Sequence, residues 1–194
     1  MLAIEDVCSE ADSREKSFSV RPEQMNLPDG RDVKLRSIQA TDRDLLVEFG
    51  QSLSLESRYQ RFFSARDFLP GEVDRLTNID YEREMALMAV VGSGHIEKEV
   101  GVARYVRDET GESCDIAIVI SDAWQHRGLG QRLLDALLKI ATAKGIRFAT
   151  GITMSTNYGM IRLARKAGFL TRHDPDDATV MRLSKDLSAK SSFA

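Results

Sequence analysis

The chain has 194 residues, enough for one domain with a sizeable core, and its 42% hydrophobic and 29% charged residues are ordinary for a soluble globular protein. Its formal net charge of −3 gives no overall attraction to nucleic acid or to an anionic membrane, so neither is expected as a partner. The longest apolar runs, such as Met85–Val91, are far too short for a transmembrane helix, and the acidic N-terminus does not have the pattern of a signal peptide. We therefore expect a cytoplasmic protein.

The spacing of cysteine residues argues against a metal site. Cys8 and Cys114 form no CxxC or Cys/His pattern, so we expect free thiols, no disulfide and no metal cofactor. Cys114 is also a poor candidate for a nucleophile, because no histidine partner lies near it in the sequence.

The first 80 residues are predicted to form a tail, a hairpin and three helices. Residues 1–17 are polar and aperiodic, as in a flexible tail. The Asp29-Gly30 pair lies between two alternating runs, which is typical of a hairpin turn. Helices are then predicted from Thr41, which can act as an N-cap, from Ser54 to Phe63, and from Pro70 to about Asn78.

The rest of the chain begins with strands and ends in alternating strands and helices. Three runs rich in β-branched and apolar residues predict an antiparallel meander: Met85–Val91, Val100–Val106 and Asp115–Ile120. The later elements are predicted as a helix over Gly128–Lys144, a strand over Ile146–Ile152, a helix over Asn157–Ala167 and a strand over Thr179–Leu183. One domain is expected over residues 18–187, with a short tail over 188–194.

A strand, a glycine-containing loop and a long helix follow each other directly between Cys114 and Lys144. The first turn of a helix has backbone N–H groups without partners in the helix, and these donors together with the helix dipole attract anions. Glycine at 128 and 130 removes the Cβ atoms that would keep phosphate oxygens away from the backbone, and Arg127 and Arg132 add positive charge. This pattern predicts a phosphate site, although a purely structural glycine turn would look the same.

Two common nucleotide motifs do not fit the loop. The Walker pattern G-x-x-x-x-G-K-[ST] is absent. The dinucleotide-binding pattern G-x-G-x-x-G fails because position 133 is leucine, and the loop comes late in the chain, after three strands of antiparallel type.

The segment Gln125-His126-Arg127-Gly128-Leu129-Gly130 resembles the acetyl-CoA motif Q/R-x-x-G-x-G/A of the GNAT superfamily of N-acetyltransferases. The resemblance covers about residues 31–185 and is strongest to the GNAT domain of Pat-type bacterial protein lysine acetyltransferases. Four further segments support it: Leu53–Ser64, Ile79–Leu87, Gly151–Met154 and Asn157–Phe169. The resemblance implies an α/β (α+β) GNAT fold, in which a mixed, mostly antiparallel sheet of six to seven strands carries helices on both faces.

The resemblance also implies where acetyl-CoA, the co-substrate, would bind. In GNAT enzymes the strand before the motif separates from its neighbour, and its backbone pairs with the pantetheine arm; that stretch corresponds to Ile118, Val119 and Ile120. The family's pyrophosphate loop corresponds to the following residues: Gln125, His126, Arg127, Gly128, Leu129, Gly130 and Gln131. Asn157 corresponds to an asparagine that contacts the cofactor arm, although the residues alone equally predict a helix N-cap there.

For catalysis, the resemblance implies direct attack of an amine on the thioester in a ternary complex. An alkylamine arrives protonated at neutral pH, so some group must accept its proton. Pat-type domains have a glutamate at the position of Asp115, which makes Asp115 the candidate general base, expected to be shielded from water between Cys114 and Ile116. A backbone N–H, that of Val119, is the expected oxyanion donor. Many GNAT enzymes use a tyrosine as general acid, but the corresponding residue here is Ala164.

The acceptor is the least determined part of this interpretation. Arg58, Tyr59 and Arg61 in the second predicted helix are candidates to line the acceptor side, although Tyr59 and Phe62 could equally be core residues. The leading hypothesis is an N-acetyltransferase that acts on an amine, with a protein lysine as one acceptor class and a small-molecule amine as the alternative. A third alternative is an acyl-CoA-binding regulatory module without turnover, which the aspartate at 115 and the alanine at 164 keep open. A homodimer also stays open.

Overall fold

The computed structural model describes residues 22–63, 69–93 and 96–188. Its strands are β1 (Glu23–Asn26), β2 (Asp32–Ser37), β3 (Glu84–Val91), β4 (Lys98–Arg107), β5 (Ser113–Ile120), β6 (Phe148–Met154), β7 (Leu170–His173) and β8 (Val180–Asp186). Its α-helices are α1 (Arg43–Ser52), α2 (Leu55–Phe62), α3 (Pro70–Thr77), α4 (Leu129–Ala143) and α5 (Tyr158–Lys166). Two short 3-10 helices, η1 (Ala40–Asp42) and η3 (Asp122–Trp124), precede α1 and the loop before α4.

Within these described ranges the eight strands form one mixed sheet in the order β1-β2-β3-β4-β5-β6-β8-β7. Neighbouring strands run antiparallel except for β5 and β6, which are parallel. Helix α4 makes the crossover between these two strands, as a parallel connection requires. The predicted meander of β3, β4 and β5 is confirmed.

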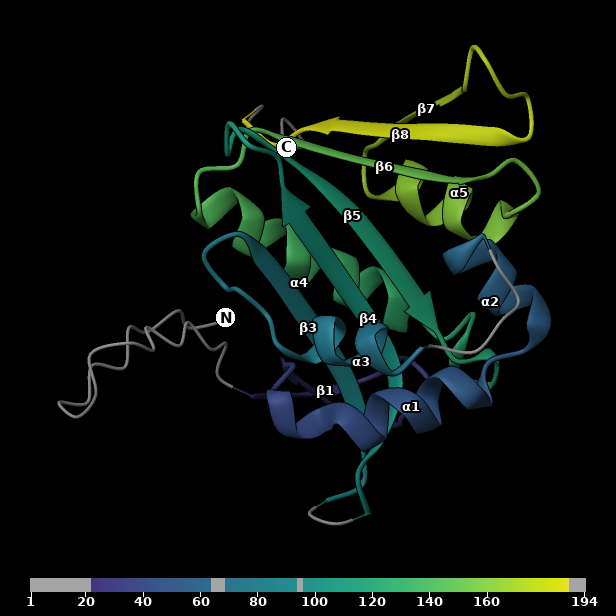
Figure 1. Ribbon diagram of the computed structural model, residues 1–194. Helices are drawn as coiled ribbons and strands as arrows, with labels where there is room; N and C mark the ends of the chain where they lie inside the picture. Colours follow the sequence, from purple (N-terminus) through teal and green to yellow (C-terminus); the bar gives the residue numbers. More distant parts are fainter. Residues whose placement is uncertain (1–21, 64–68, 94–95, 189–194) are drawn as a thin grey trace, which may run out of the picture.

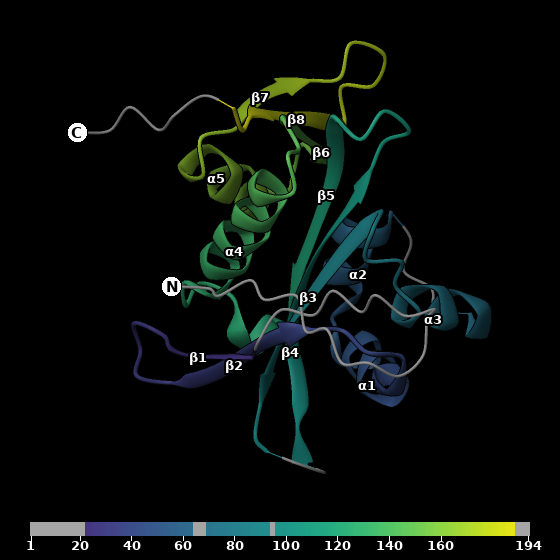
Figure 2. The same ribbon diagram turned by 90° about the vertical axis from the view of Figure 1, so that its left-hand side faces the viewer.

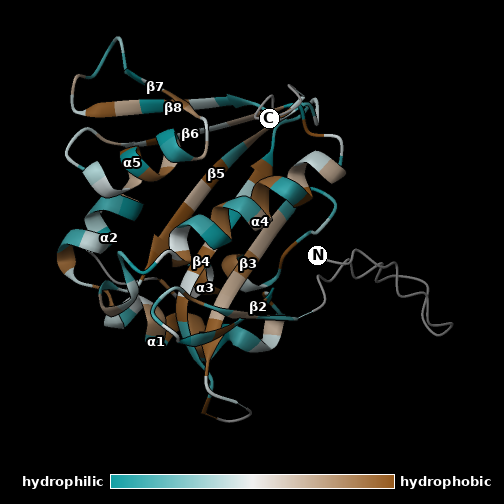
Figure 3. Cartoon of the chain, turned by 180° about the vertical axis from the view of Figure 1, so that it is seen from behind, coloured by the Kyte–Doolittle hydropathy of each residue, from teal (hydrophilic) through white to brown (hydrophobic). Residues whose placement is uncertain are grey.

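Helices cover both faces of the sheet, as expected. Helices α1, α2 and α3 lie on one side, and α4 and α5 lie on the other (Figures 1 and 2). The larger hydrophobic cluster joins α4 to the sheet, and its α4 members repeat with helical periodicity: Leu133, Leu134, Leu137, Leu138 and Ala141. A smaller cluster packs α1 against β3, β4 and β5. Colouring by hydropathy shows α4, with both hydrophilic and hydrophobic residues, lying across the mostly hydrophobic central strands (Figure 3).

Strands β5 and β6 pair only at one end. Their register runs from Ser113 opposite Phe148 to Asp115 opposite Thr150 and then stops. From Ile116 onward the strands separate, so among the described residues the β6-facing backbone edge of β5 has no strand partner. Figure 1 shows the two strands diverging from this point. The fold therefore leaves an open backbone edge in the middle of its sheet.

Most predicted elements are confirmed, with boundary shifts of one to three residues, and two details were wrong. The sheet has eight strands and not six to seven, because the short edge strand β7 was not predicted. Asp42, rather than Thr41, is the N-cap residue of α1. The predicted N-terminal tail over residues 1–17 lies outside the described residues.

No helix in the described ranges has both the length and the apolar character needed to cross a membrane.

Candidate active site

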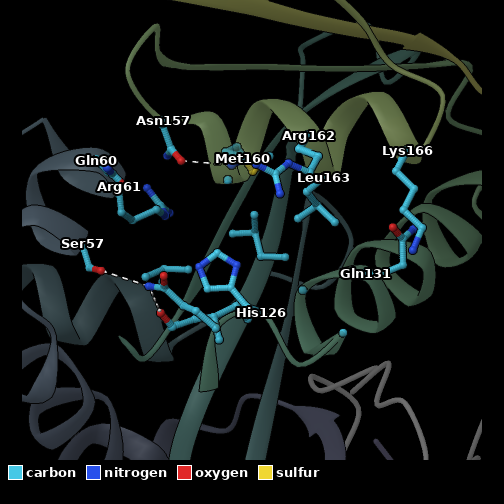
Figure 4. Close-up of a pocket in the computed structure, with 17 residues that line it drawn as sticks. Ser57, Gln60, Arg61, His126, Gln131, Asn157, Met160, Arg162, Leu163 and Lys166 are labelled. Atoms are coloured by element: carbon cyan, nitrogen blue, oxygen red, sulfur yellow. Dashed lines mark hydrogen bonds between the residues drawn. The ribbon is translucent and has the colours of Figure 1, made fainter. Parts of the chain in front are cut away.

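A cavity of about 390 Å³ lies at the open edge of β5, between α2 on one side and α4 and α5 on the other (Figure 4). We call it the β5 cavity. The residues that line it come from α2, the end of β5, the loop before α4, the first turn of α4 and the length of α5. They are Ser57, Gln60, Arg61, Ile118, Val119, Ile120, Gln125, His126, Gly128, Gly130, Gln131, Asn157, Gly159, Met160, Arg162, Leu163 and Lys166.

The N-terminus of α4 opens into this cavity. Gly128 is the N-cap residue with φ of 85°, a left-handed conformation that glycine adopts without strain, and no side chain caps the helix. The N–H groups of the first turn therefore have no partner within the helix and no capping side chain. Gly130 adds no side chain at the cavity wall. A helix N-terminus with this access can hold a phosphate group.

Gln125 fixes the loop to its surroundings. Its Nε2 donates hydrogen bonds to the Ile120 carbonyl and to Ser57 Oγ, each at 3.1 Å (Figure 4). Asp122, three residues earlier, accepts hydrogen bonds from the Ser57 hydroxyl and from Ser54 at 2.7–2.9 Å. These contacts tie the loop to the end of β5 and to the first turn of α2, so α2 forms a fixed wall of the cavity.

All predicted cofactor residues except Arg127 and Leu129 line the β5 cavity. Leu129 is fully buried in the main hydrophobic cluster. Arg127 is held away by Asp29, which accepts a hydrogen bond from its Nη1 at 2.8 Å, and by the Ala123 carbonyl. Neither side chain is placed to contact a ligand in the cavity, and only their backbone groups remain as candidates. Arg132 also lies outside the lining.

Asn157 caps α5 and also lines the cavity, while its contact with the cofactor arm stays a prediction. Its Oδ1 accepts a hydrogen bond from the Met160 N–H at 3.0 Å, which makes it the N-cap of α5, and the residue also lines the cavity (Figure 4). The capping bond uses the side-chain oxygen, so the amide nitrogen remains available as a donor.

Basic side chains line the cavity on two sides. Arg162 and Lys166 extend from one face of α5, and Arg61 extends from α2 (Figure 4). Burial, together with the charges of Arg104 and Arg75, lowers the pKa of Arg61 to about 10, so the side chain is still protonated at neutral pH. The α5 cations suit a ligand with several phosphate groups.

Asp115 lies where β5 and β6 begin to separate, on the face of the sheet that carries α1, α2 and α3. Its Oδ1 accepts a hydrogen bond from the Thr150 hydroxyl. The side chain is exposed, so the expectation that Cys114 and Ile116 shield it from water was wrong. The reason is strand alternation, because both neighbours point to the opposite, buried face. Asp115 does not line the β5 cavity but lies three residues before Ile118, the first β5 residue of the lining.

Other candidates for proton transfer are less well placed. Cys114 is buried, and burial raises the pKa of its thiol to about 12, so it is a neutral core residue. Ala164 is fully buried in α5, and Tyr158, at the start of α5, is 70% exposed. None of the residues that line the cavity is a tyrosine.

Of the three α2 candidates, Arg58, Tyr59 and Arg61, only Arg61 lines the cavity. Sequence reasoning missed the other α2 lining residues and the whole α5 wall. On α2 the lining residues are Ser57, Gln60 and Arg61, and on α5 they are spaced by three or four residues from Gly159 to Lys166. This spacing marks one face of a helix, but a polar face is ordinary on a surface helix, so the pattern alone does not indicate a cavity.

Within the part of the chain that the structure describes, no three or more His, Cys, Asp or Glu side chains gather as a metal-ligand set.

Comparisons with known proteins agree with this geometry. The model of the acetyltransferase (GNAT) family matches residues 53–169. An acetyltransferase of Pseudomonas aeruginosa is 33% identical over 155 residues, which are 79% of this chain and 83% of that protein. The acetyltransferase Pat of Mycolicibacterium smegmatis is 24% identical over 135 residues, 69% of this chain, and the match spans 40% of that longer protein.

Among solved structures, the GNAT domain of PAT from S. lividans superposes with a TM-score of 0.78 at 28% identity, covering 85% of this chain and 96% of that one. An acetyltransferase from Salmonella typhimurium, solved with its cofactor acetyl-CoA, has the same fold, with a TM-score of 0.66 at 15% identity over 84% of this chain and 99% of that one.

Proposed function

Since this chain belongs to the GNAT family of acetyltransferases and uses acetyl-CoA, we propose that it transfers the acetyl group to a primary amine, by direct attack within a ternary complex. The observation that carries the proposal is the β5 cavity, in which an open strand edge meets an uncapped helix N-terminus. The first feature suits an amide-containing arm, and the second suits a pyrophosphate.

The proposed binding mode assigns each part of acetyl-CoA to one wall of the cavity. The pantetheine amides pair with the backbone of Ile118, Val119 and Ile120, as an added strand would. The pyrophosphate lies on the N–H groups of the loop and of the first turn of α4. Arg162 and Lys166 add charge-assisted contacts to phosphate oxygens. Asn157 has a free amide nitrogen for the arm between these two ends.

The proposed reaction is a single displacement at the thioester carbonyl. The unprotonated amine attacks the carbonyl carbon and a C–N bond forms. The attacking nitrogen then gives up one N–H proton to water, and the C–S bond breaks with its electron pair leaving on sulfur. The ammonium form of the acceptor must first lose a proton, and we assign its acceptance to Asp115, directly or through water. The N–H of Val119 is the proposed donor to the oxyanion.

The leaving thiolate needs no positioned acid in this proposal. Alkyl thiols have a pKa of about 8.5, so a thiolate is a tolerable leaving group near neutral pH and can take a proton from water. The absence of tyrosine among the cavity-lining residues agrees with this assignment.

A protein lysine is one candidate acceptor class, supported by the similarity to the two Pat proteins. A small-molecule amine is the other, and a sheet face open to solvent beside Asp115 accommodates both.

One experiment separates these acceptors. The protein is incubated with acetyl-CoA and either a cell extract or a panel of small amines, while CoA release is followed. We expect CoA release that depends on the amine, with acetyl-lysine in extract proteins or an N-acetylated small amine identified by mass spectrometry. If CoA is released at the same rate without any amine, and no acetylated product forms in either arm, amine transfer is wrong.

A further inference from the structure

Among the described residues, none forms an ion pair with Arg61. Its Nε is buried, and no described residue accepts a hydrogen bond from the guanidinium. Its one aromatic contact is with the Phe62 ring, 4.9 Å from Cζ to the centroid. Buried charges are normally paired in a folded protein, so an unpaired one in a cavity wall points to a partner that is a ligand.

The charges around Arg61 make an anionic partner more favourable. Arg104 and Arg75 are the charges that act on it, and both repel it. Arg104 donates a hydrogen bond to the Leu76 carbonyl, and the carboxylates of Glu99 and Glu84 act on Arg104. Neither carboxylate acts on Arg61, so no described acidic residue offsets the repulsion that lowers the pKa of Arg61.

The position of Arg61 separates it from the pyrophosphate loop. Ser57 contacts Gln125 at the start of that loop, and Arg61 is four residues further along α2, one turn or about 6 Å along the helix axis. Arg104, whose charge acts on Arg61, pairs with Ala117 of β5. Ala117 is three residues, roughly 10 Å, before Ile120 at the loop end of the strand.

The same placement brings Arg61 toward the reacting end of the cavity. Asp115 and Ala117 lie on one face of β5, two residues or about 7 Å apart, and this face carries α2. Figure 4 shows Arg61 reaching into the cavity from α2. The guanidinium thus lies between the phosphate loop and the proposed base, where the acceptor amine would enter.

From this arrangement, and resting on the proposed amine transfer, we infer that the acceptor carries a carboxylate near its amine and that Arg61 binds this carboxylate. A planar guanidinium can donate two parallel hydrogen bonds to a carboxylate, which fixes the orientation of the acceptor as well as holding it. Two sources share this chemistry: a free amino acid, and a protein lysine next to aspartate or glutamate.

The test compares acceptors that differ only in the carboxylate. L-lysine is paired with cadaverine, and a blocked peptide Gly-Asp-Lys-Asp-Gly is paired with Gly-Asn-Lys-Asn-Gly. We expect kcat/KM to be at least about tenfold higher for the carboxylate-bearing member of one pair. The pair that shows this preference identifies whether the acceptor is a free amino acid or a protein lysine. In Arg61→Gln this ratio should fall toward one, whereas the KM for acetyl-CoA should change less than about twofold.

Two matched variants check the interpretation. Arg162→Gln removes a cavity cation on α5, and it should raise the KM for acetyl-CoA while the acceptor ratio stays unchanged. Arg61→Lys keeps the charge but loses the planar fork, and it should recover only part of the ratio. Without ligand, Arg61→Gln should melt at or above the wild-type temperature, because it removes an unpaired buried charge; a clearly lower melting temperature would indicate a structural role instead.

Three outcomes contradict this inference without contradicting the proposed amine transfer. One is efficient acetylation of the carboxylate-free amine with no preference in either pair, which leaves amine transfer itself intact. Another is a preference that Arg61→Gln does not change. The third is an Arg61→Gln effect confined to use of succinyl-CoA in place of acetyl-CoA, which would place the carboxylate on the acyl donor. No turnover with any amine would overturn both this inference and the proposed function.

Discussion

Asp115 shows how strand alternation decides the role of a single residue. Cys114 and Ile116 point into the core around α4, so Asp115 between them must point to the opposite face. That face is open to solvent where β5 and β6 separate, and Thr150 holds the carboxylate there. An aspartate is one methylene shorter than the glutamate of Pat-type domains, so a water between Asp115 and the amine is consistent with this placement.

Replacing Asp115 with asparagine keeps the shape and removes the proton acceptor. We expect Asp115→Asn to lower kcat by about 10²–10⁴-fold, the range typical for a general base, with little change in the Kd of acetyl-CoA. Steady-state kinetics and a binding titration measure the two quantities. Glu112→Gln, which removes an exposed carboxylate three residues upstream, is the matched control and should behave as wild type. Equal turnover in both variants would show that Asp115 is not the base.

At the scale of elements, the site depends on how β5 ends and α4 begins. The loop between them places Gly128 in the left-handed region, which lets the chain turn directly into the helix while its first N–H groups face the cavity. Gln125 and Asp122 join this loop to α2, so three elements that are distant in sequence share one cavity.

Gly128→Ala tests this arrangement. A side chain in the left-handed region costs roughly 1–2 kcal/mol, so we expect a destabilisation of that size and weaker acetyl-CoA binding, by about tenfold. Denaturant unfolding and titration calorimetry give the two values. Gly71→Ala in α3 is the control, because its Cβ meets no atom within 4 Å and alanine favours a helix, so it should be neutral or stabilising. Unchanged affinity in Gly128→Ala would contradict the role assigned to the loop.

The sequence was informative where periodicity and glycine position both constrain the backbone. The stripe of α4, the hairpin turn at Asp29-Gly30 and the strands of the meander were predictable for this reason. Strand β7 was not, because its four residues show no apolar alternation and depend on pairing with β8. The loop and β5 edge of the site followed from the motif, but the outward position of Arg127 depends on Asp29, which is 98 residues away.

Arg61 illustrates the same limit more sharply. Its segment resembles Pat-type domains, yet nothing local distinguishes a cavity-facing arginine from an exposed one on a polar helix. The repulsion that acts on its charge comes from Arg104 on β4 and Arg75 on α3, which act on it only in the folded protein. Long-range charge environments of this kind are set by tertiary packing and cannot be read from residue spacing.

At the scale of the whole molecule, a buried carboxylate makes stability depend on pH. Glu99 on β4 is only 6% exposed, and among the described residues neither of its carboxylate oxygens has a hydrogen-bond partner. Burial raises its pKa well above the usual value. In the unfolded chain the proton leaves near the ordinary value of about 4.3, so the unfolded state binds fewer protons and stability falls as pH rises toward the raised pKa.

Glu99→Gln should remove this pH dependence. We expect the variant and the wild type to melt within about 2 °C of each other near pH 5, since the neutral acid and the amide are close in shape. At pH 8–9 the variant should melt higher by several degrees, given about 2–4 °C per kcal/mol for a domain of this size. Calorimetric melting at several pH values measures the gap, and a gap that does not widen with pH would contradict a neutral Glu99.

The central claim is that the β5 cavity binds acetyl-CoA along β5 and at the N-terminus of α4. A thermal melt of the wild-type protein with increasing acetyl-CoA tests it most directly, with Gly128→Ala melted beside it. At 100 times the Kd, ligand binding stabilises a fold by about 2.7 kcal/mol, which corresponds to a rise of roughly 5–10 °C. We predict this rise in the wild type, displaced to higher acetyl-CoA concentration in Gly128→Ala. No rise at millimolar acetyl-CoA, or identical curves for the two proteins, would contradict the assignment of the site.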